Sequence, residues 1–237
     1  MDMETEIIST VEANTAEKTE FGVLPYLDRL VFGDCVKLMR NLPDGCIDLV
    51  VTDPPYVANY CDRGGRRIFN DDNARWIYPA FFEAYRVMKD DAFCFSFYGW
   101  TKVDKFLAAW RECGLRPVGH FTCVKHYSSS VGFTKMEHEC AYLLVKGSPA
   151  RPTNPPADVL PWKYTGNKLH PTQKPISALT PIIEAYSEKG DIVLDPFGGS
   201  GSTAIAARLC ERHFVLFEKD EQYFEAARLR LLAEQTE

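Results

Sequence analysis

Short apolar runs recur along the chain and are separated by longer stretches in which apolar residues follow a helical period. The runs are rich in β-branched and aromatic residues, which favours strands, and they cover residues 30–32, 47–51, 92–97, 118–124, 140–145, 192–194 and 214–217. Amphipathic stretches predict helices at 74–88, 101–113, 176–187, 203–210 and 221–232. This alternation predicts an α/β fold with a doubly wound, mostly parallel sheet of seven strands.

The chain is long enough for one well-buried domain and short for two, since it has 237 residues. Residues 1–23 are polar, acidic and aperiodic, so we expect a flexible tail followed by a single domain over 24–237. Two segments interrupt the alternation, at 57–73 and 147–169, and both read as irregular connections longer than usual.

The formal net charge is −6, and residues 1–20 contribute most of it with six acidic side chains and one lysine. The rest of the chain is near neutral, so a surface that binds phosphates must come from local clusters. The eight cysteines are scattered without a C-x-x-C pair, which argues against a metal site. No apolar stretch is long enough to span a membrane and no signal peptide is evident, so we expect a soluble, cytoplasmic protein.

A glycine-rich turn directly follows the apolar run at 192–194, with the sequence Asp195-Pro196-Phe197-Gly198-Gly199-Ser200-Gly201. Glycine lets backbone N–H groups approach a bound nucleotide closely. Glu218 ends the next apolar run, where a carboxylate is well placed for ribose hydroxyls. The turn lacks the G-K-[ST] of a P-loop and fits G-x-G-x-x-G poorly. It predicts a nucleoside site, and a tight turn made for packing is the alternative.

A second short motif, Asp53-Pro54-Pro55-Tyr56, follows the run at 47–52. Proline fixes its own backbone and restricts the residue before it, so the carboxylate of Asp53 and the carbonyl of Pro54 are presented on a stiff segment. Tyr56 adds an aromatic face. An ordinary turn at a strand end is the competing interpretation.

Together the two motifs resemble those of the DNA amino-methyltransferases, which methylate the exocyclic nitrogen of adenine or cytosine with S-adenosylmethionine. The order of the motifs is similar to that of the circularly permuted beta class. The resemblance implies that Asp53 and Pro54 accept hydrogen bonds from the target amino group. It also implies that Tyr56 stacks on a base flipped out of the duplex, and that Asp195 and the glycine loop hold the cofactor.

The resemblance extends to residues outside the two motifs. His170-Pro171-Thr172-Gln173-Lys174-Pro175 is similar to the family element that cradles the methionine end of the cofactor, where Thr172 and Lys174 could reach its carboxylate. If the fold is permuted, the strand at 30–32 lies beside the strand that ends at Glu218, and Asp34 can accept from the adenine of the cofactor. Capping of a helix at 35–42 is the other role open to Asp34.

Candidate contacts to double-stranded DNA are few. Arg63, Arg66 and Arg67 could bind phosphate, although a solvated loop explains them nearly as well. Lys125 and the pair His138-Glu139 resemble the W-x-K and H-E elements of the family, and Lys125 is a further candidate. There is no room for a large recognition insert, so target recognition falls to 57–73 and 147–169 or is shared in a homodimer.

These features predict a DNA N6-adenine methyltransferase. N4-cytosine methylation is the nearest alternative, because the acidic clamp formed by Asp53-Pro54-Pro55-Tyr56 would serve either amino group. By resemblance to the family, Asp rather than Ser at position 53 favours adenine. Methylation of RNA or of protein glutamine fits the sequence less well. The family members with those activities usually have an Asn-Pro-Pro-Tyr motif, placed after the glycine loop. An inactive cofactor-binding regulator is the alternative from a different class.

Overall fold

The computed structural model describes residues 22–62, 64–130 and 132–234. Most of the predicted acidic tail, and Arg63, therefore lie outside the described residues. The described chain forms one sheet of eight strands: β1 (Arg29–Phe32), β2 (Ile47–Thr52), β3 (Met88–Phe97), β4 (Arg116–Lys125), β5 (His138–Val145), β6 (Val159–Trp162), β7 (Ile192–Asp195) and β8 (His213–Glu218). The helices are α1 (Cys35–Met39), α2 (Ile77–Val87), α3 (Val103–Cys113), α4 (Ile176–Tyr186), α5 (Ser202–Leu209) and α6 (Glu221–Ala233).

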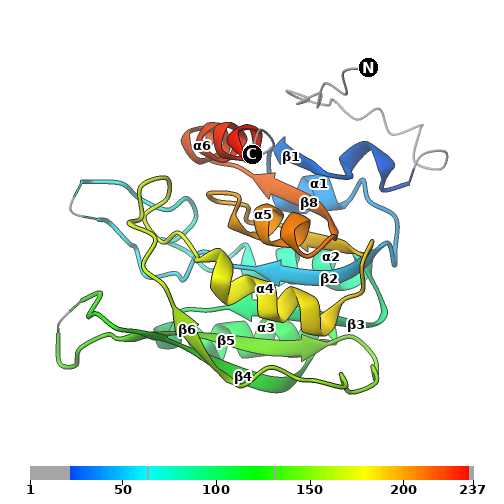
Figure 1. Ribbon diagram of the computed structural model, residues 1–237, viewed down its shortest axis with the longest axis horizontal. Helices are drawn as coiled ribbons and strands as arrows, with labels where there is room; N and C mark the ends of the chain where they lie inside the picture. The colour runs from blue at the N-terminus through cyan, green and yellow to red at the C-terminus, as the bar shows by residue number, and fades with distance from the viewer. Residues whose placement is uncertain (1–21, 63, 131, 235–237) are drawn as a thin grey trace.

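The order of strands across the sheet is β1-β8-β7-β2-β3-β5-β4-β6. Within the described sheet only β5 runs antiparallel to its neighbours. Among the described strands, the one nearest the N-terminus, β1, pairs with the one nearest the C-terminus, β8 (Figure 1). In this pairing Phe32 lies opposite Glu218. This neighbourhood confirms the α/β fold class and the permuted order that the motifs predicted.

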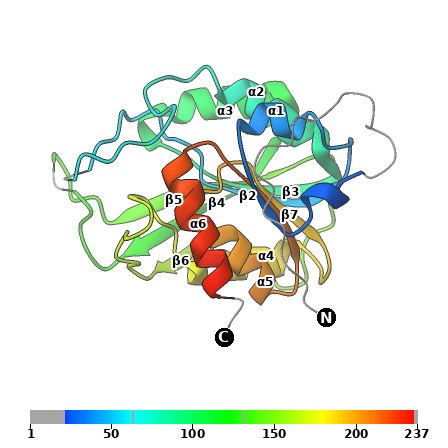
Figure 2. The ribbon, with the colours of Figure 1, turned by 90° about the horizontal axis from the view of Figure 1, so that it is seen from above.

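Helices cover both faces of the sheet. Figure 2 shows α1, α2 and α3 on one face and α4, α5 and α6 on the other. Along β2, Val50 belongs to the first core, whereas its neighbours Leu49 and Val51 belong to the second. Because successive side chains of a strand point to opposite faces, a strand buried on both sides is apolar throughout, as the sequence pattern indicated.

The sheet has one strand more than predicted. β6 lies within 147–169, which was expected to be irregular, and it pairs with β4 at the edge of the sheet. Its exposure alternates, since Leu160 and Trp162 are buried and Val159 and Pro161 are exposed. Proline is tolerated in such an edge strand because one side of the backbone needs no ladder hydrogen bonds.

Seven of the eight described strands point the same way, so their carboxyl ends meet at one edge of the sheet. Asp53, Asp195, Glu218 and Lys125 all lie at this edge, as expected for a site in an open α/β sheet. None of the described helices is both long and apolar enough to cross a membrane.

Candidate active site

A pocket opens at the carboxyl edge of the sheet, and both sequence motifs line it. Asp53, Pro54, Pro55 and Tyr56 approach from the end of β2, and residues 195–200 approach from the end of the neighbouring strand β7. Glu218, Asp34, Thr172 and Lys174 line the same pocket. The structure thus brings the acidic clamp and the glycine loop together, although they are more than 130 residues apart in the chain.

Backbone hydrogen bonds hold the glycine loop against β8. The N–H of Gly198 donates to the carbonyl of Phe217 at 2.7 Å, and a Cβ on Gly198 would lie 3.2 Å from that oxygen. Gly201 has a φ of +77°, a conformation that side chains disfavour. Ahead of the loop, the carboxylate of Asp195 accepts from the Phe197 N–H at 3.0 Å and from the Thr203 hydroxyl at 2.6 Å. Burial nevertheless raises the pKa of Asp195 to about 7.

Glu218 is fixed in the same way. Its Oε2 accepts from the N–H of Gly199 at 2.7 Å, and its Oε1 accepts from the N–H groups of Lys219 at 2.8 Å and Asp220 at 2.7 Å. These backbone bonds lower its pKa, but burial outweighs them and raises the pKa to about 7. The carboxylate therefore has a fixed orientation at the mouth of the glycine loop.

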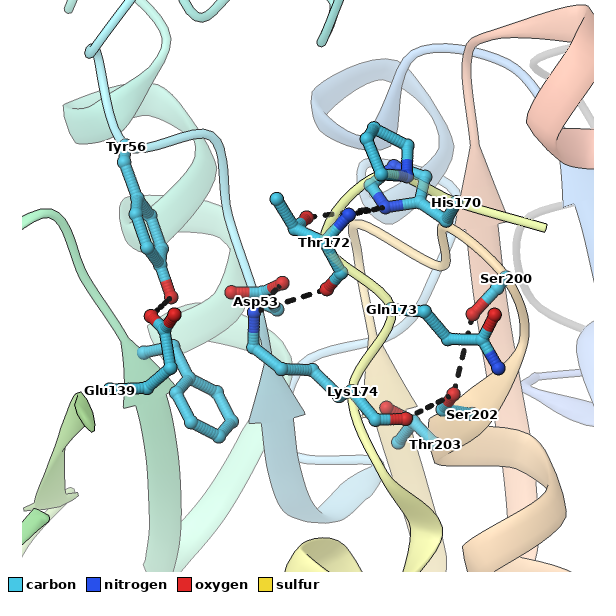
Figure 3. Close-up of polar contacts among 12 residues, drawn as sticks. Asp53, Tyr56, Glu139, His170, Thr172, Gln173, Lys174, Ser200, Ser202 and Thr203 are labelled. Carbon is cyan, nitrogen blue, oxygen red and sulfur yellow. Dashed lines mark hydrogen bonds and ion pairs between the residues drawn. The ribbon is translucent and has the colours of Figure 1, made fainter. Parts of the chain in front are cut away.

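The acidic clamp is held by a side chain instead. Asp53 Oδ2 accepts from the ammonium of Lys174 (Figure 3), and its Oδ1 is buried without a well-aligned partner among the described residues. Burial raises the pKa of Asp53, and the positive charge of Lys174 acts against that shift. The ammonium also lies over the rings of Phe97 at 4.9 Å, Tyr56 at 5.4 Å and Trp162 at 5.7 Å. The clamp and Lys174 line the pocket, whereas Phe97 and Trp162 are buried.

Comparison with known proteins agrees with this arrangement. The family model described as DNA methylase (N6_N4_Mtase) matches residues 47–229, which include both motifs. The chain belongs to the N6/N4 DNA methylase family. It is 47% identical over 209 residues to the Escherichia coli (strain K12) protein "Putative methylase YubD", which covers 88% of this chain and 92% of that protein.

Solved methylase structures share the fold. The M1.HpyAVI complex with SAM superimposes with a TM-score of 0.66 at 23% identity, over 85% of this chain and 98% of that chain. The PvuII DNA methyltransferase, which is cytosine-N4-specific, gives a TM-score of 0.70 at 19% identity over 85% of each chain. The family uses S-adenosylmethionine as its cofactor. The methylase fold therefore covers most of the described chain.

Several groups of the methylase pocket fit a molecule with a nucleoside at one end and an amino acid at the other. The carboxylates of Glu218 and Asp34 line the pocket and could accept from a nucleoside. The Oε1 atom of Gln173, also a lining residue, is buried and has no hydrogen-bond partner among the described residues, so a polar ligand group could satisfy it. Within the described residues, no group of His, Cys, Asp and Glu side chains is arranged to hold a metal ion.

Asp34 has the capping role that the sequence left open. Its carboxylate accepts from the N–H groups of Val36 at 3.1 Å and Lys37 at 3.3 Å at the start of α1, and from the Lys219 ammonium at 2.8 Å. Burial would raise its pKa, but these bonds outweigh burial and the pKa is lowered. Capping and lining the pocket are compatible, and the contact of Asp34 with the cofactor stays a prediction.

The His170–Pro175 segment lies against the glycine loop. Ser202 donates to the carbonyl of Lys174 at 2.8 Å, and His170 packs edge-on against the ring of Tyr223 at 4.2 Å. Burial lowers the pKa of His170 to about 3, so its Nδ1 accepts from Thr172 at 3.3 Å in the neutral ring. Lys174 points toward Asp53, and its predicted contact with the cofactor carboxylate stays a prediction.

The predicted DNA contacts lie in two different settings. Lys125 is only 6% exposed and forms an ion pair with Glu139 inside the site. Arg66 pairs with Asp62 at 2.7 Å and also donates to the carbonyl of Asn167 at 3.2 Å, which ties the 57–73 segment to the 147–169 segment. Arg67 is exposed. Contacts of these three side chains with DNA stay predictions.

Some residues of the site were missed in the sequence. Trp162, which packs against the Lys174 ammonium, comes from the unexpected strand β6, where Pro161 weighed against a strand. Ile68 and Phe69 of the 57–73 segment line the same pocket as the glycine loop, so this candidate for target recognition also borders the pocket. Thr203, which donates to Asp195, follows the motif directly and could have been included.

Proposed function

We propose that the chain transfers a methyl group from S-adenosylmethionine to the N6 amino group of adenine in DNA. The observation that carries this proposal is the shared pocket of Asp53 and the glycine loop. The clamp stands at the end of β2, the loop stands at the end of the adjacent strand β7, and both open onto the same space. A target amino group at Asp53 would therefore face a cofactor held by the loop.

The nucleoside of the cofactor would lie against Glu218 and Asp34, and its amino-acid end would lie against Thr172, Gln173 and Lys174. When bound, S-adenosylmethionine supplies an electrophilic methyl group on a positively charged sulfonium. The carboxylate of Glu218 is suited to ribose hydroxyls because three backbone N–H groups already fix its orientation. Little ordering is then left to be done when the cofactor binds.

The clamp addresses the weak nucleophilicity of the target. The lone pair of an exocyclic amino nitrogen is delocalised into the ring, so the nitrogen must become more tetrahedral before it can attack. Asp53 Oδ1, which has no well-aligned partner, and the carbonyl of Pro54 could each accept one N–H of the amino group. Both acceptors stand on a backbone stiffened by two prolines, which favours the geometry of the transition state over that of the free base.

A base stacked in a duplex cannot reach Asp53, so it must be flipped out. Tyr56 lines the pocket and offers an aromatic face beside the clamp, whereas Phe97 and Trp162 are buried around the Lys174 ammonium. A flipped purine would exchange its stacking in the duplex for contact with the Tyr56 ring.

One assay separates the candidate functions. The protein is incubated with tritiated S-adenosylmethionine and plasmid DNA, and the DNA is digested to nucleosides that are then separated. We expect label in N6-methyladenine. Label in N4-methylcytosine would replace the adenine assignment, which rests on Asp at position 53 by family resemblance. Binding of the cofactor without any transfer to DNA would instead favour the inactive regulator.

A further inference from the structure

A second ion pair, of buried Lys125 with partly buried Glu139, lies beside the clamp on strands β4 and β5. Glu139, near the start of β5, accepts from the hydroxyl of Tyr56 at 3.3 Å through Oε2, and its Oε1 is paired with the ammonium of Lys125 at the end of β4. Figure 3 shows the Tyr56 ring directed from the clamp toward this carboxylate. Tyr56 is therefore bound at its hydroxyl by a residue 83 positions away in the chain.

The other end of Tyr56 is also constrained. Gly99 lies so close that a Cβ there would be 2.5 Å from the carbonyl oxygen of Tyr56 and 2.8 Å from its Cβ. The backbone of Tyr56 thus packs directly against Gly99, and the hydroxyl is held by Glu139. A ring fixed at both ends keeps one orientation, which a ring fixed only at the backbone would not.

We propose that Glu139 is a positioning residue that holds the ring of Tyr56 in the orientation needed to stack on the target base, with Lys125 aligning the carboxylate. This inference rests on the proposed function, because it assigns Tyr56 to the flipped base. A ring that is already oriented loses little side-chain entropy when the base arrives. The base is then presented to Asp53 in one pose, and small errors in pose are costly to turnover.

The charges around Tyr56 agree with this role. Burial raises its pKa, and the negative charges of Asp53 and Glu139 raise it further. The phenol therefore stays protonated and acts as the donor to Glu139. Lys125 is also 5.3 Å from the ring centre of Trp162, so the same ion pair contacts one of the buried rings around Lys174.

The alternative is that the Lys125–Glu139 pair only stabilises the fold. Removing one partner would leave a buried charge and could unfold the protein, whereas replacing both by apolar residues is often tolerated. The test therefore uses the double variant Lys125→Met/Glu139→Leu. Alongside it stand Tyr56→Phe, which leaves the ion pair intact, and the triple variant. Glu137→Gln is the control, since Glu137 is exposed and contacts Ser128 at 2.7 Å.

We expect the double variant to fold, as checked by circular dichroism, and to lose about tenfold or more in kcat on plasmid DNA. KM for DNA and the cofactor Kd should stay within about twofold, and Tyr56→Phe should lose a similar factor. The triple variant should be no slower than the double variant. Tyr56→Phe and the double variant each remove the same hydrogen bond between Tyr56 and Glu139, so their effects should not add. The control should match the wild type.

A double variant with wild-type turnover would overturn the inference. A triple variant whose loss in kcat equals the product of the losses in Tyr56→Phe and the double variant would overturn it too. If the double variant does not fold, full turnover of Tyr56→Phe overturns it and a tenfold loss supports it. A wild-type protein that binds the cofactor but methylates no DNA overturns the proposed function and this inference together. An active wild type with an equally active double variant overturns only the inference.

Discussion

The two sides of the pocket hold their buried carboxylates by different means. On the cofactor side, made by Asp195, Glu218 and the loop 198–201, the acids accept from backbone N–H groups and one hydroxyl nearby. On the target side, made by Asp53, Tyr56, Lys125, Glu139 and Lys174, each acid is paired with a lysine side chain. The cofactor side is thus fixed mainly by backbone groups, whereas the target side depends on long side chains that can change partners.

This difference suggests a division of labour. A backbone cradle keeps its shape whether or not a ligand is present, which suits a cofactor common to a whole family. An ammonium group over aromatic rings can be displaced or can turn toward another anion, which suits a side that must admit a base. The ion pair of Asp53 with Lys174 is the clearest point at which to break the comparison.

Asp53→Asn should give the largest effect. Loss of the carboxylate should lower kcat by roughly 10²–10³-fold, the loss typical of one preorganised group that acts on developing charge. Cofactor affinity, measured by calorimetry, should change little because the cofactor side has its own contacts. Full turnover in this variant would remove Asp53 from the mechanism.

The same substitution should also destabilise the protein, because it leaves the buried Lys174 ammonium without its carboxylate. Loss of one partner of such a pair costs about 3–5 kcal/mol. The double variant Asp53→Asn/Lys174→Met should regain stability in urea unfolding without regaining turnover. If stability were not regained, the ion pair would not be the source of the loss.

Glu218→Gln tests the cofactor side. The amide places a donor where three backbone N–H groups now meet an acceptor, so at least one hydrogen bond is lost. We expect the cofactor Kd to rise about tenfold, which corresponds to about 1.4 kcal/mol, and turnover at saturating cofactor to change less. Glu221→Gln, at an exposed position in the first turn of α6, is the matched control. An unchanged affinity would remove Glu218 from the cofactor site.

The pH dependence of stability tests the same carboxylate without a ligand. The folded protein keeps the proton of Glu218 up to about pH 7, whereas an unfolded glutamate releases it near 4.3. Between these values the folded state binds more protons, so the contribution of Glu218 to stability falls as pH rises and levels off above about 7. The unfolding free energy of the wild type relative to Glu218→Gln should follow this course. A difference that is flat with pH would contradict the raised pKa.

The sequence predicted the parts of the fold that rest on local pattern. Seven of the eight described strands are visible as apolar runs because burial on both faces makes them continuous, and both motifs directly follow a strand. β6 was missed because an edge strand with Pro161 carries a weak signal. The residues of the cofactor side could also be predicted from local pattern. Asp195 bonds to residues close to it in the chain, and Glu218 bonds to the loop that follows the neighbouring strand β7.

The contacts of the target side were harder to predict from the sequence, because two of them join segments that are far apart in the chain. Asp53 pairs with Lys174, 121 positions away, and Tyr56 is hydrogen-bonded to Glu139, 83 positions away. No spacing in the sequence predicts such pairs. Resemblance to the family placed Lys125 in the W-x-K element and Glu139 in the H-E element. It did not predict that the two side chains contact each other or that Glu139 contacts Tyr56. The pairing of β4 with β5 brings Lys125 beside Glu139, and β3 lies between β5 and β2, the strand that leads to Tyr56.

The smallest effect is expected on the 57–73 segment, part of which lines the pocket. Arg67 is exposed on the 57–73 segment, and its side chain makes one long contact of 3.4 Å with Asn59. If it binds a DNA phosphate, Arg67→Ala should raise KM for DNA a few-fold and reduce the salt slope of binding by about one. Cofactor affinity should not change. Lys189→Ala is the control, because Lys189 pairs with Glu211 near the start of β7, at the opposite edge of the sheet. An unchanged salt slope would show that Arg67 is a solvated loop residue, and the target side would then rely on its buried groups alone.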